Sequence, residues 1–119
     1  MPKFLFVYRS VPYNASDISP EQMQKVMQLW TDWIGEGFQK GWMLDAGDAL
    51  LPDGRTVDKN KVVTDGPFAE SKEIVGGYSV VQAATYEAAA EYAKRCPVLL
   101  DDGGSIEIRQ LAGLAPPSN

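Results

Sequence analysis

The chain is organised around a loop that runs directly into a strand: Thr64-Asp65-Gly66-Pro67-Phe68-Ala69-Glu70-Ser71-Lys72-Glu73, followed by Ile74-Val75-Gly76-Gly77-Tyr78. The loop concentrates turn-forming residues and opposed charges, and the apolar residues after it are typical of a strand. Paired glycines inside a strand indicate a bulge or the close approach of another backbone or a ligand. This stretch therefore predicts a strand, over residues 73–83, whose entry loop can line a site.

The chain begins with a strand and a helix. Residues 4–8 are apolar on both alternating faces, which predicts a central strand that is covered on both sides. Ser19-Pro20 followed by Gln22 has the spacing of a capping box with proline in the first turn, so a helix is expected over residues 20–40. Its apolar stripe, which includes Met23, Met27 and Trp30, is interpreted as core in preference to a ligand wall.

The remaining elements follow the same logic. A strand is expected over 42–51, broken near Ala46-Gly47, and a short hairpin over 55–58 and 61–64. Thr85 caps a second helix that buries Cys96 and ends at Pro97. Residues 105–111 alternate apolar and polar, with Ile106 and Ile108 on one face and Glu107 and Arg109 on the other, as in a half-buried strand.

The resulting order is β-α-β-β-α-β with an inserted hairpin, which is the ferredoxin-like α+β arrangement. Both helices would cover one face of an antiparallel sheet. The opposite face would then remain open, with apolar residues of the first strand beside Glu107 and Arg109. An uncovered face of this kind predicts a homodimer in which sheet faces sheet.

Length and composition exclude some classes of protein. With 119 residues the chain is long enough for one domain, over residues 1–112, followed by a tail over 113–119. A formal charge of −5 and scattered basic residues argue against binding nucleic acid. The first apolar run is too short for a membrane span, and a single cysteine cannot form an internal disulfide, so a cytoplasmic protein is expected.

The chain contains no histidine, which excludes histidine-based catalysis and histidine-ligated metals. Asp45, Asp48 and Asp65 match no metal-binding loop, and the paired glycines lie inside a strand instead of at a helix start, so no metal or cofactor is expected. Cys96 has no flanking base and is interpreted as a buried side chain.

The candidate site residues have two interpretations each. Asp65 can hold the turn through its own backbone, or it can be an acid or base near Tyr78. Glu70, Lys72 and Glu73 can be a solvated charge pattern, or they can pair with arginines at a cleft. The candidate catalytic residues are thus Asp65 and Tyr78, and the candidate ligand-binding residues are Arg9, Asp48, Glu70, Lys72 and Arg109.

Arg9 and Arg109 are the candidate anion clamp, because an arginine side chain can bind an anionic ligand through two parallel hydrogen bonds. The alternative is an ordinary ion pair at the dimer interface. Whether the protein is an enzyme is left open by the residues alone.

These residues carry a family resemblance. The run 63–73, Gly76-Gly77-Tyr78, Ala46-Gly47-Asp48-Ala49-Leu50, Arg95-Cys96-Pro97 and residues 104–109 resemble the DGPF-motif proteins of the YCII-related superfamily, over essentially the whole chain. The resemblance implies a ferredoxin-like domain that dimerises in the manner of dimeric α/β barrels, with a small-molecule cleft between sheet and helices. Some related members resemble enzymes with a His-Asp pair, which this chain lacks.

Two functions are therefore expected. The first is a homodimer that binds a small anionic or polar metabolite, with chemistry of the lyase or isomerase type. The alternative is a non-catalytic regulatory or interaction module associated with sigma-factor signalling, because the chain has no histidine and no recognisable catalytic constellation. The resemblance also implies genes that neighbour those of extracytoplasmic-function sigma factors.

Overall fold

A capping box begins the long helix α1 (Pro20–Lys40). The Ser19 hydroxyl accepts a hydrogen bond from the Gln22 N–H, and the Gln22 side chain accepts one from the Ser19 N–H. Gly41 forms the C-terminal cap. The helix expected over residues 20–40 is therefore confirmed, with its start. The computed structural model describes residues 1–12, 18–66 and 73–114.

Four antiparallel strands form the main sheet, in the order β2-β5-β1-β6. They are β1 (Lys3–Ser10), β2 (Met43–Ala49), β5 (Ile74–Gln82) and β6 (Ser105–Gln110). The first strand is central, as its apolar character on both faces predicts. Its Phe4, Phe6 and Tyr8 are buried, whereas Leu5 and Val7 are only partly buried.

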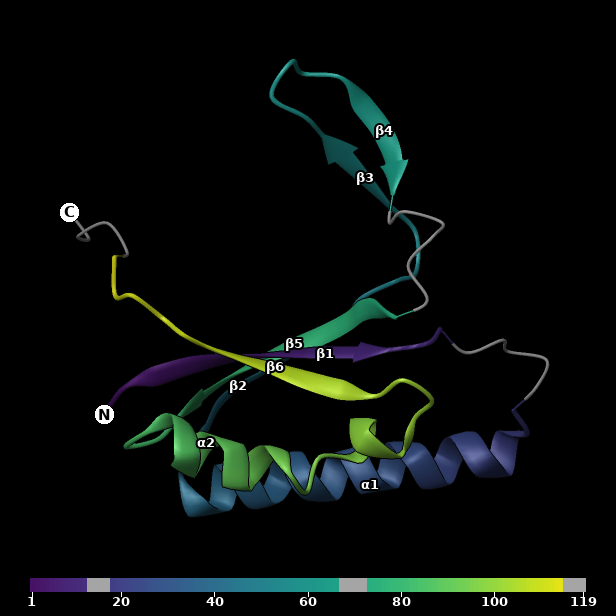
Figure 1. Ribbon diagram of the computed structural model, residues 1–119. Coiled ribbons are helices and arrows are strands. Elements are labelled where there is room, and N and C mark those ends of the chain that lie inside the picture. The colour runs from purple at the N-terminus through teal and green to yellow at the C-terminus, as the bar shows by residue number, and fades with distance from the viewer. Residues whose placement is uncertain (13–17, 67–72, 115–119) are drawn as a thin grey trace.

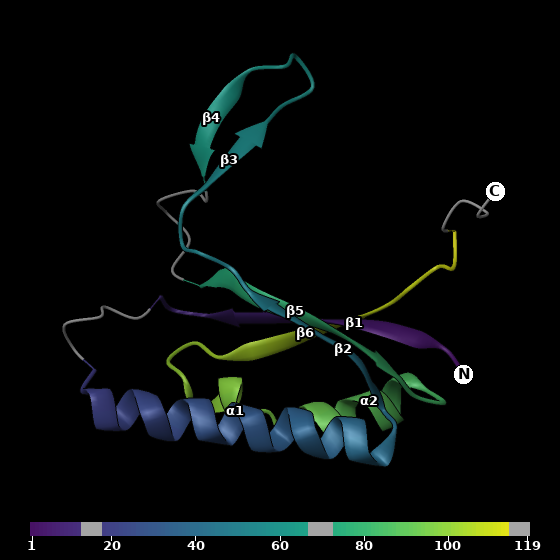
Figure 2. The ribbon, with the colours of Figure 1, turned by 180° about the vertical axis from the view of Figure 1, so that it is seen from behind.

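Both helices cover the same face of this sheet (Figures 1 and 2). Thr85 caps α2 (Tyr86–Ala93) as expected, but the helix ends before Cys96. A short 3-10 helix, η2 (Pro97–Leu100), then begins at the proline, with Cys96 as its N-cap. The prediction that one helix runs to Pro97 is wrong, although Ala89, Ala93 and Cys96 are all buried.

The expected hairpin is also present. Strands β3 (Gly54–Val57) and β4 (Val63–Gly66) pair only with each other, in a separate two-stranded sheet. The hairpin stands away from the main sheet on the side opposite the helices (Figures 1 and 2). The order of elements and strands is that of the ferredoxin-like α+β fold, which confirms the predicted fold class.

The sheet face away from the helices is left open. Paired residues of neighbouring strands point to the same side, so Leu5 and Val80 share this face with Val7 and Tyr78. Arg9, Glu107 and Arg109 lie on it as well. We call these seven residues the open face.

No helix in the described part of the chain has both the length and the apolar character that a membrane span requires.

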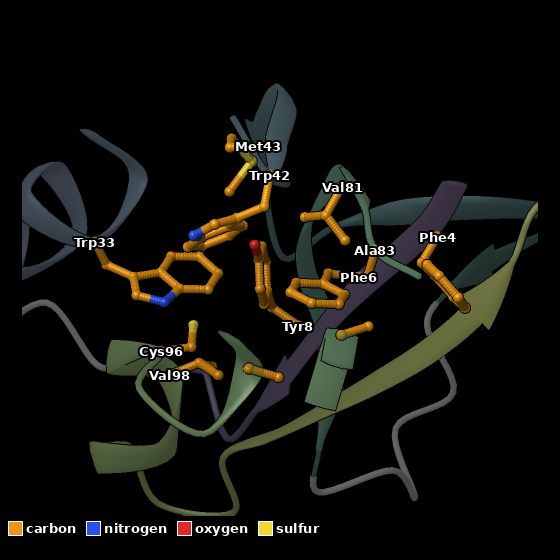
Figure 3. Packing of buried hydrophobic residues seen from close by; sticks show 12 residues of the cluster. Phe4, Phe6, Tyr8, Trp33, Trp42, Met43, Val81, Ala83, Cys96 and Val98 are labelled. Atoms are coloured by element: carbon orange, nitrogen blue, oxygen red, sulfur yellow. The ribbon is translucent and has the colours of Figure 1, made fainter. Parts of the chain in front are cut away.

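The core between sheet and helices is strongly aromatic (Figure 3). Trp33 stacks near Phe6, with ring centroids 6.3 Å apart, and lies 5.3 Å from Trp42. Trp42 in turn stacks on Tyr92 of α2 at 4.5 Å. The Trp33 indole N–H donates a hydrogen bond to the Tyr92 carbonyl, which ties α1 to α2. Burial of these rings supplies most of the packing that holds both helices on one face.

One chain of buried hydrogen bonds crosses three strands beneath this core. The Tyr8 hydroxyl of β1 donates to the Ser79 Oγ of β5 at 2.7 Å. The Ser79 hydroxyl then donates to the Ala46 carbonyl of β2 at 2.7 Å. Ser79 is fully buried, so each of these polar groups depends on the others for a partner.

Replacing Ser79 with alanine should therefore destabilise the fold by roughly 1–3 kcal/mol, because the buried Tyr8 hydroxyl loses its acceptor and Ala46 loses its donor. Urea unfolding followed by circular dichroism measures this difference. The matched control is Ser105→Ala, an exposed serine of β6, for which a change within about 0.5 kcal/mol is expected. Equal effects of the two substitutions would contradict the role of Ser79.

Candidate functional site

A cavity of about 570 Å³ lies between the N-terminal half of α1 and the sheet. Its walls come from the end of β1, from α1, from the middle of β2, from the start of β5 and from η2. Tyr8 and Trp30 line it, with ring centroids 4.9 Å apart in an edge-to-face arrangement. Since both rings also contact the aromatic core, one end of the cavity is rigidly held.

The helical wall is apolar. Met23, Met27, Trp30 and Ile34 recur at intervals of three and four, and all of them line the cavity. Met23 and Met27 remain 38% and 59% exposed, whereas Trp33 further along the helix is buried in the core. The stripe predicted to be core therefore divides: Trp33 packs in the core and Met23 and Met27 border the cavity. Phe38, the last residue of the predicted stripe, is 50% exposed, so its assignment to the core is wrong. The apolar stripe in the sequence therefore contained the cavity wall, but it was interpreted as core alone.

The opposite wall is a bulge in β2, where the predicted break near Ala46-Gly47 is found. Gly47 has a φ of 67°, and its N–H donates to the Asp45 carboxylate at 2.8 Å. A Cβ on Gly47 would lie only 1.8 Å from the Tyr78 carbonyl oxygen, so β2 and β5 approach too closely there for a side chain. Together with the Ser79 hydrogen bond to Ala46, this contact fixes the shape of the wall.

The polar lining is sparse and acidic. The polar lining residues are Ser10, Tyr8, Tyr78 and two acidic residues, Asp48 and Asp101, and the described lining contains no lysine or arginine. The Asp48 carboxylate accepts a hydrogen bond from the Ala49 N–H at 2.8 Å. Burial raises the pKa of the Tyr8 phenol far above its ordinary value, so this hydroxyl stays protonated and keeps donating to Ser79.

Of the candidate residues from the sequence, Asp48 and Tyr78 are brought together. They are paired across β2 and β5, and both line the cavity. Tyr78 is 38% exposed, and its position on β5 also places it on the open face. Gly76 and Gly77 also line the cavity. A Cβ on Gly77 would lie 2.8 Å from the Asp48 carbonyl oxygen, so the paired glycines do mark the close approach of another backbone.

The two candidate arginines lie elsewhere. Arg9 and Arg109 both bond the carboxylate of Glu107 on the open face, at 3.1 Å and 3.2 Å. Hydrogen bonds from Arg9 and then Arg109 hold the pKa of Glu107 below its usual range. Neither arginine lines the cavity described above.

Asp65 lies on the hairpin. Its side chain is 92% exposed and lies 3.3 Å from Arg55 Nε of the paired strand, and it does not line the cavity. Glu70 and Lys72 lie outside the described residues. Among the residues that the structure does describe, no group of three acidic or cysteine side chains gathers in a way that could hold a metal ion.

Comparison with known proteins adds one finding. A family model described as the YCII-related domain matches residues 4–113, nearly the whole chain. A search of curated proteins found no match.

The bulge can be tested with two glycines that both line the cavity. Gly47→Ala should destabilise the protein by at least about 2 kcal/mol, because the new methyl group strains a left-handed backbone and collides with the Tyr78 carbonyl. Gly76→Ala should change stability by less than about 1 kcal/mol, because nothing lies within 4 Å of the added carbon. Thermal unfolding of both variants measures the difference, and equal melting temperatures would contradict the geometry of the bulge.

Cys96 should be unreactive in the native protein. Burial raises the pKa of its thiol to about 12, which lowers the thiolate fraction at pH 8 about a thousandfold relative to an ordinary cysteine. A thiol-specific chromogenic disulfide at pH 8 should label the native chain far more slowly than the urea-unfolded chain. Equal labelling rates would show that the thiol is accessible and ionised.

Proposed function

Because the chain belongs to the YCII-related domain family, we propose that it is a homodimeric protein that binds a small molecule in the cavity between α1 and the sheet. The single observation that carries this proposal is the cavity itself. Small-molecule sites in proteins are usually preformed hollows of a few hundred Å³, mostly apolar, with a few placed polar groups. The cavity has that volume and that lining.

The lining favours a ligand with a flat apolar body and a neutral or cationic polar end. Trp30 and the two methionines offer an aromatic face and adaptable thioethers to an apolar body. Asp48 and Asp101 would repel an anion, and no basic side chain of the described lining would offset that repulsion. The sequence led us to expect an anionic or a polar metabolite, and we therefore propose the polar one.

The arginines expected to clamp an anion have another role in this proposal. Both bond Glu107, and all three side chains lie on the open face. We assign that face to the dimer, because Leu5, Val7, Tyr78 and Val80 form an apolar surface on it that no element of the described chain covers. The paired charges would then lie within the dimer interface, which is the alternative interpretation of Arg9 and Arg109.

Chemistry of the lyase or isomerase type would require an acid or base at the ligand. Asp48 and Tyr78 are the supporting pair, because they are register partners that both line the cavity. Asp65, the other candidate, pairs with Arg55 on the hairpin instead.

The regulatory alternative keeps the same ligand site without turnover. Conversion of a bound ligand, lost in Asp48→Asn and Tyr78→Phe, separates an enzyme from a sensor.

The cavity and its preferred charge can be tested with two dyes. N-phenyl-1-naphthylamine is neutral, and 1-anilinonaphthalene-8-sulfonate has the same rings with an added sulfonate. The neutral dye should bind more tightly, because the sulfonate would face Asp48 and Asp101. Fluorescence titration of the full chain measures both dissociation constants. Tighter binding of the sulfonate would contradict the proposed ligand class.

Two variants of α1 locate the dye. Met27→Asp places a charge in the cavity wall and should weaken binding of the neutral dye about tenfold, which corresponds to about 1.4 kcal/mol. Leu29→Asp is the matched control, because Leu29 is 45% exposed on the same helix and does not line the cavity. If both substitutions weaken binding equally, the dye is bound elsewhere and the proposed site is wrong.

A further inference from the structure

The β3–β4 hairpin projects from the body with two exposed valines. Val57 and Val63 are paired across the two strands and are 63% and 61% exposed. Arg55 and Asp65, the next pair but one, share their face of the hairpin, while Thr56 and Thr64 lie on the other face. Neither strand packs substantially against the helices or the main sheet.

A hairpin of this size is not stable by itself. Isolated two-stranded hairpins are marginal in water, and stability comes when a third strand or a packed apolar face is added. Strands of four residues that pair only with each other lack both within this chain. The valine pair is the apolar surface that a partner would cover.

The chain exposes more surface than a compact monomer of its mass would expose. The accessible area is 8666 Å², whereas a compact monomer of 13.0 kDa exposes about 6,300 Å². The excess of about 2,300 Å² is in the range that one subunit contributes to a large obligate interface. The radius of gyration, 16.1 Å, likewise exceeds the roughly 13.5 Å of a compact chain of this length.

The hairpin and the open face lie on the same side of the molecule, opposite the helices (Figures 1 and 2). A partner seated on the open face would therefore also meet the hairpin. In a two-fold dimer each subunit presents the same surfaces to the other, so one hairpin and one sheet from each chain are covered together. The charges on both surfaces are paired within the chain, as Arg9–Glu107–Arg109 and as Arg55–Asp65, so the net charge of −5 does not oppose contact there.

We propose that the hairpin is a dimerisation arm, which packs on a second copy of this chain through Val57 and Val63. This inference rests on the dimer of the proposed function. It adds a second contact surface, which would increase the affinity of the two copies for each other. The arm begins directly after Leu50 and Pro52, which line the cavity, so dimer contacts and the cavity rim share one segment of chain.

Sedimentation equilibrium of the full chain tests the arm. The wild-type chain should be dimeric at micromolar concentration. The double variant Val57→Asp/Val63→Asp should raise the dimer dissociation constant at least tenfold, because two charges replace the apolar contact. The matched control Thr56→Asp/Thr64→Asp adds the same charges to the other face of the same hairpin and should change the constant by less than threefold.

The outcomes separate the arm from the rest of the account. A wild-type dimer that tolerates Val57→Asp/Val63→Asp, or that weakens equally in both double variants, would overturn the arm and leave the open-face dimer standing. A monomeric wild-type chain would overturn both the arm and the dimer. Leu5→Lys on the open face should dissociate the dimer. If it does not, the open face is not the interface, whereas the arm is tested by the valine double variant alone. Binding of N-phenyl-1-naphthylamine by each variant reports on the cavity independently and confirms that the variants are folded.

Discussion

The buried hydrogen bonds from Tyr8 through Ser79 to Ala46 are the constraint on which the rest of the structure depends. They join β1, β5 and β2 at the point where β2 leaves regular pairing. Without the Ser79 hydroxyl, the part-buried carbonyl of Ala46 would lose this hydrogen bond, which supports the bulge. Because Ala46 and Gly47 of the bulge line the cavity, this polar contact helps to shape one of its walls.

The cavity and the ion pairs of Glu107 lie on opposite faces of the sheet. Tyr8 and Trp30 end the cavity where the aromatic core begins, so the cavity cannot collapse without disturbing Trp33 and Phe6. The arginines and Glu107 lie across the sheet, on the open face, where they neutralise one another. A ligand and a second copy of the chain would therefore approach the same sheet from opposite faces.

Most of the fold could be predicted from local patterns. The capping box at Ser19 and Gln22 and the alternation of Ile106 with Glu107 each have one physical interpretation, and they predict a helix start and a half-buried strand that the structure confirms. The short helix η2 could not be predicted, because the proline at its start reads equally as the end of the preceding helix. The cavity was harder to predict from the sequence. Met23 and Met27 belong to an apolar stripe, and the period of that stripe indicates an apolar helix face but not whether the protein core or a ligand covers it. Asp65 shows the same limit. Its motif suggested a turn residue or a site residue, but Asp65 lies in strand β4 and pairs with Arg55, and the direction in which the hairpin projects depends on tertiary structure.

The central claim is that the apolar hollow beside the bulge is the ligand site of this YCII-related protein. Its most direct test is a two-dimensional nitrogen–proton spectrum of the full chain, titrated with N-phenyl-1-naphthylamine. The account predicts that the indole N–H of Trp30 and the amides of Gly47 and Gly77 shift, while the amides of Thr56 and Thr64 on the hairpin do not. Shifts confined to the hairpin or the open face, with Trp30 and Gly47 unmoved, would contradict it.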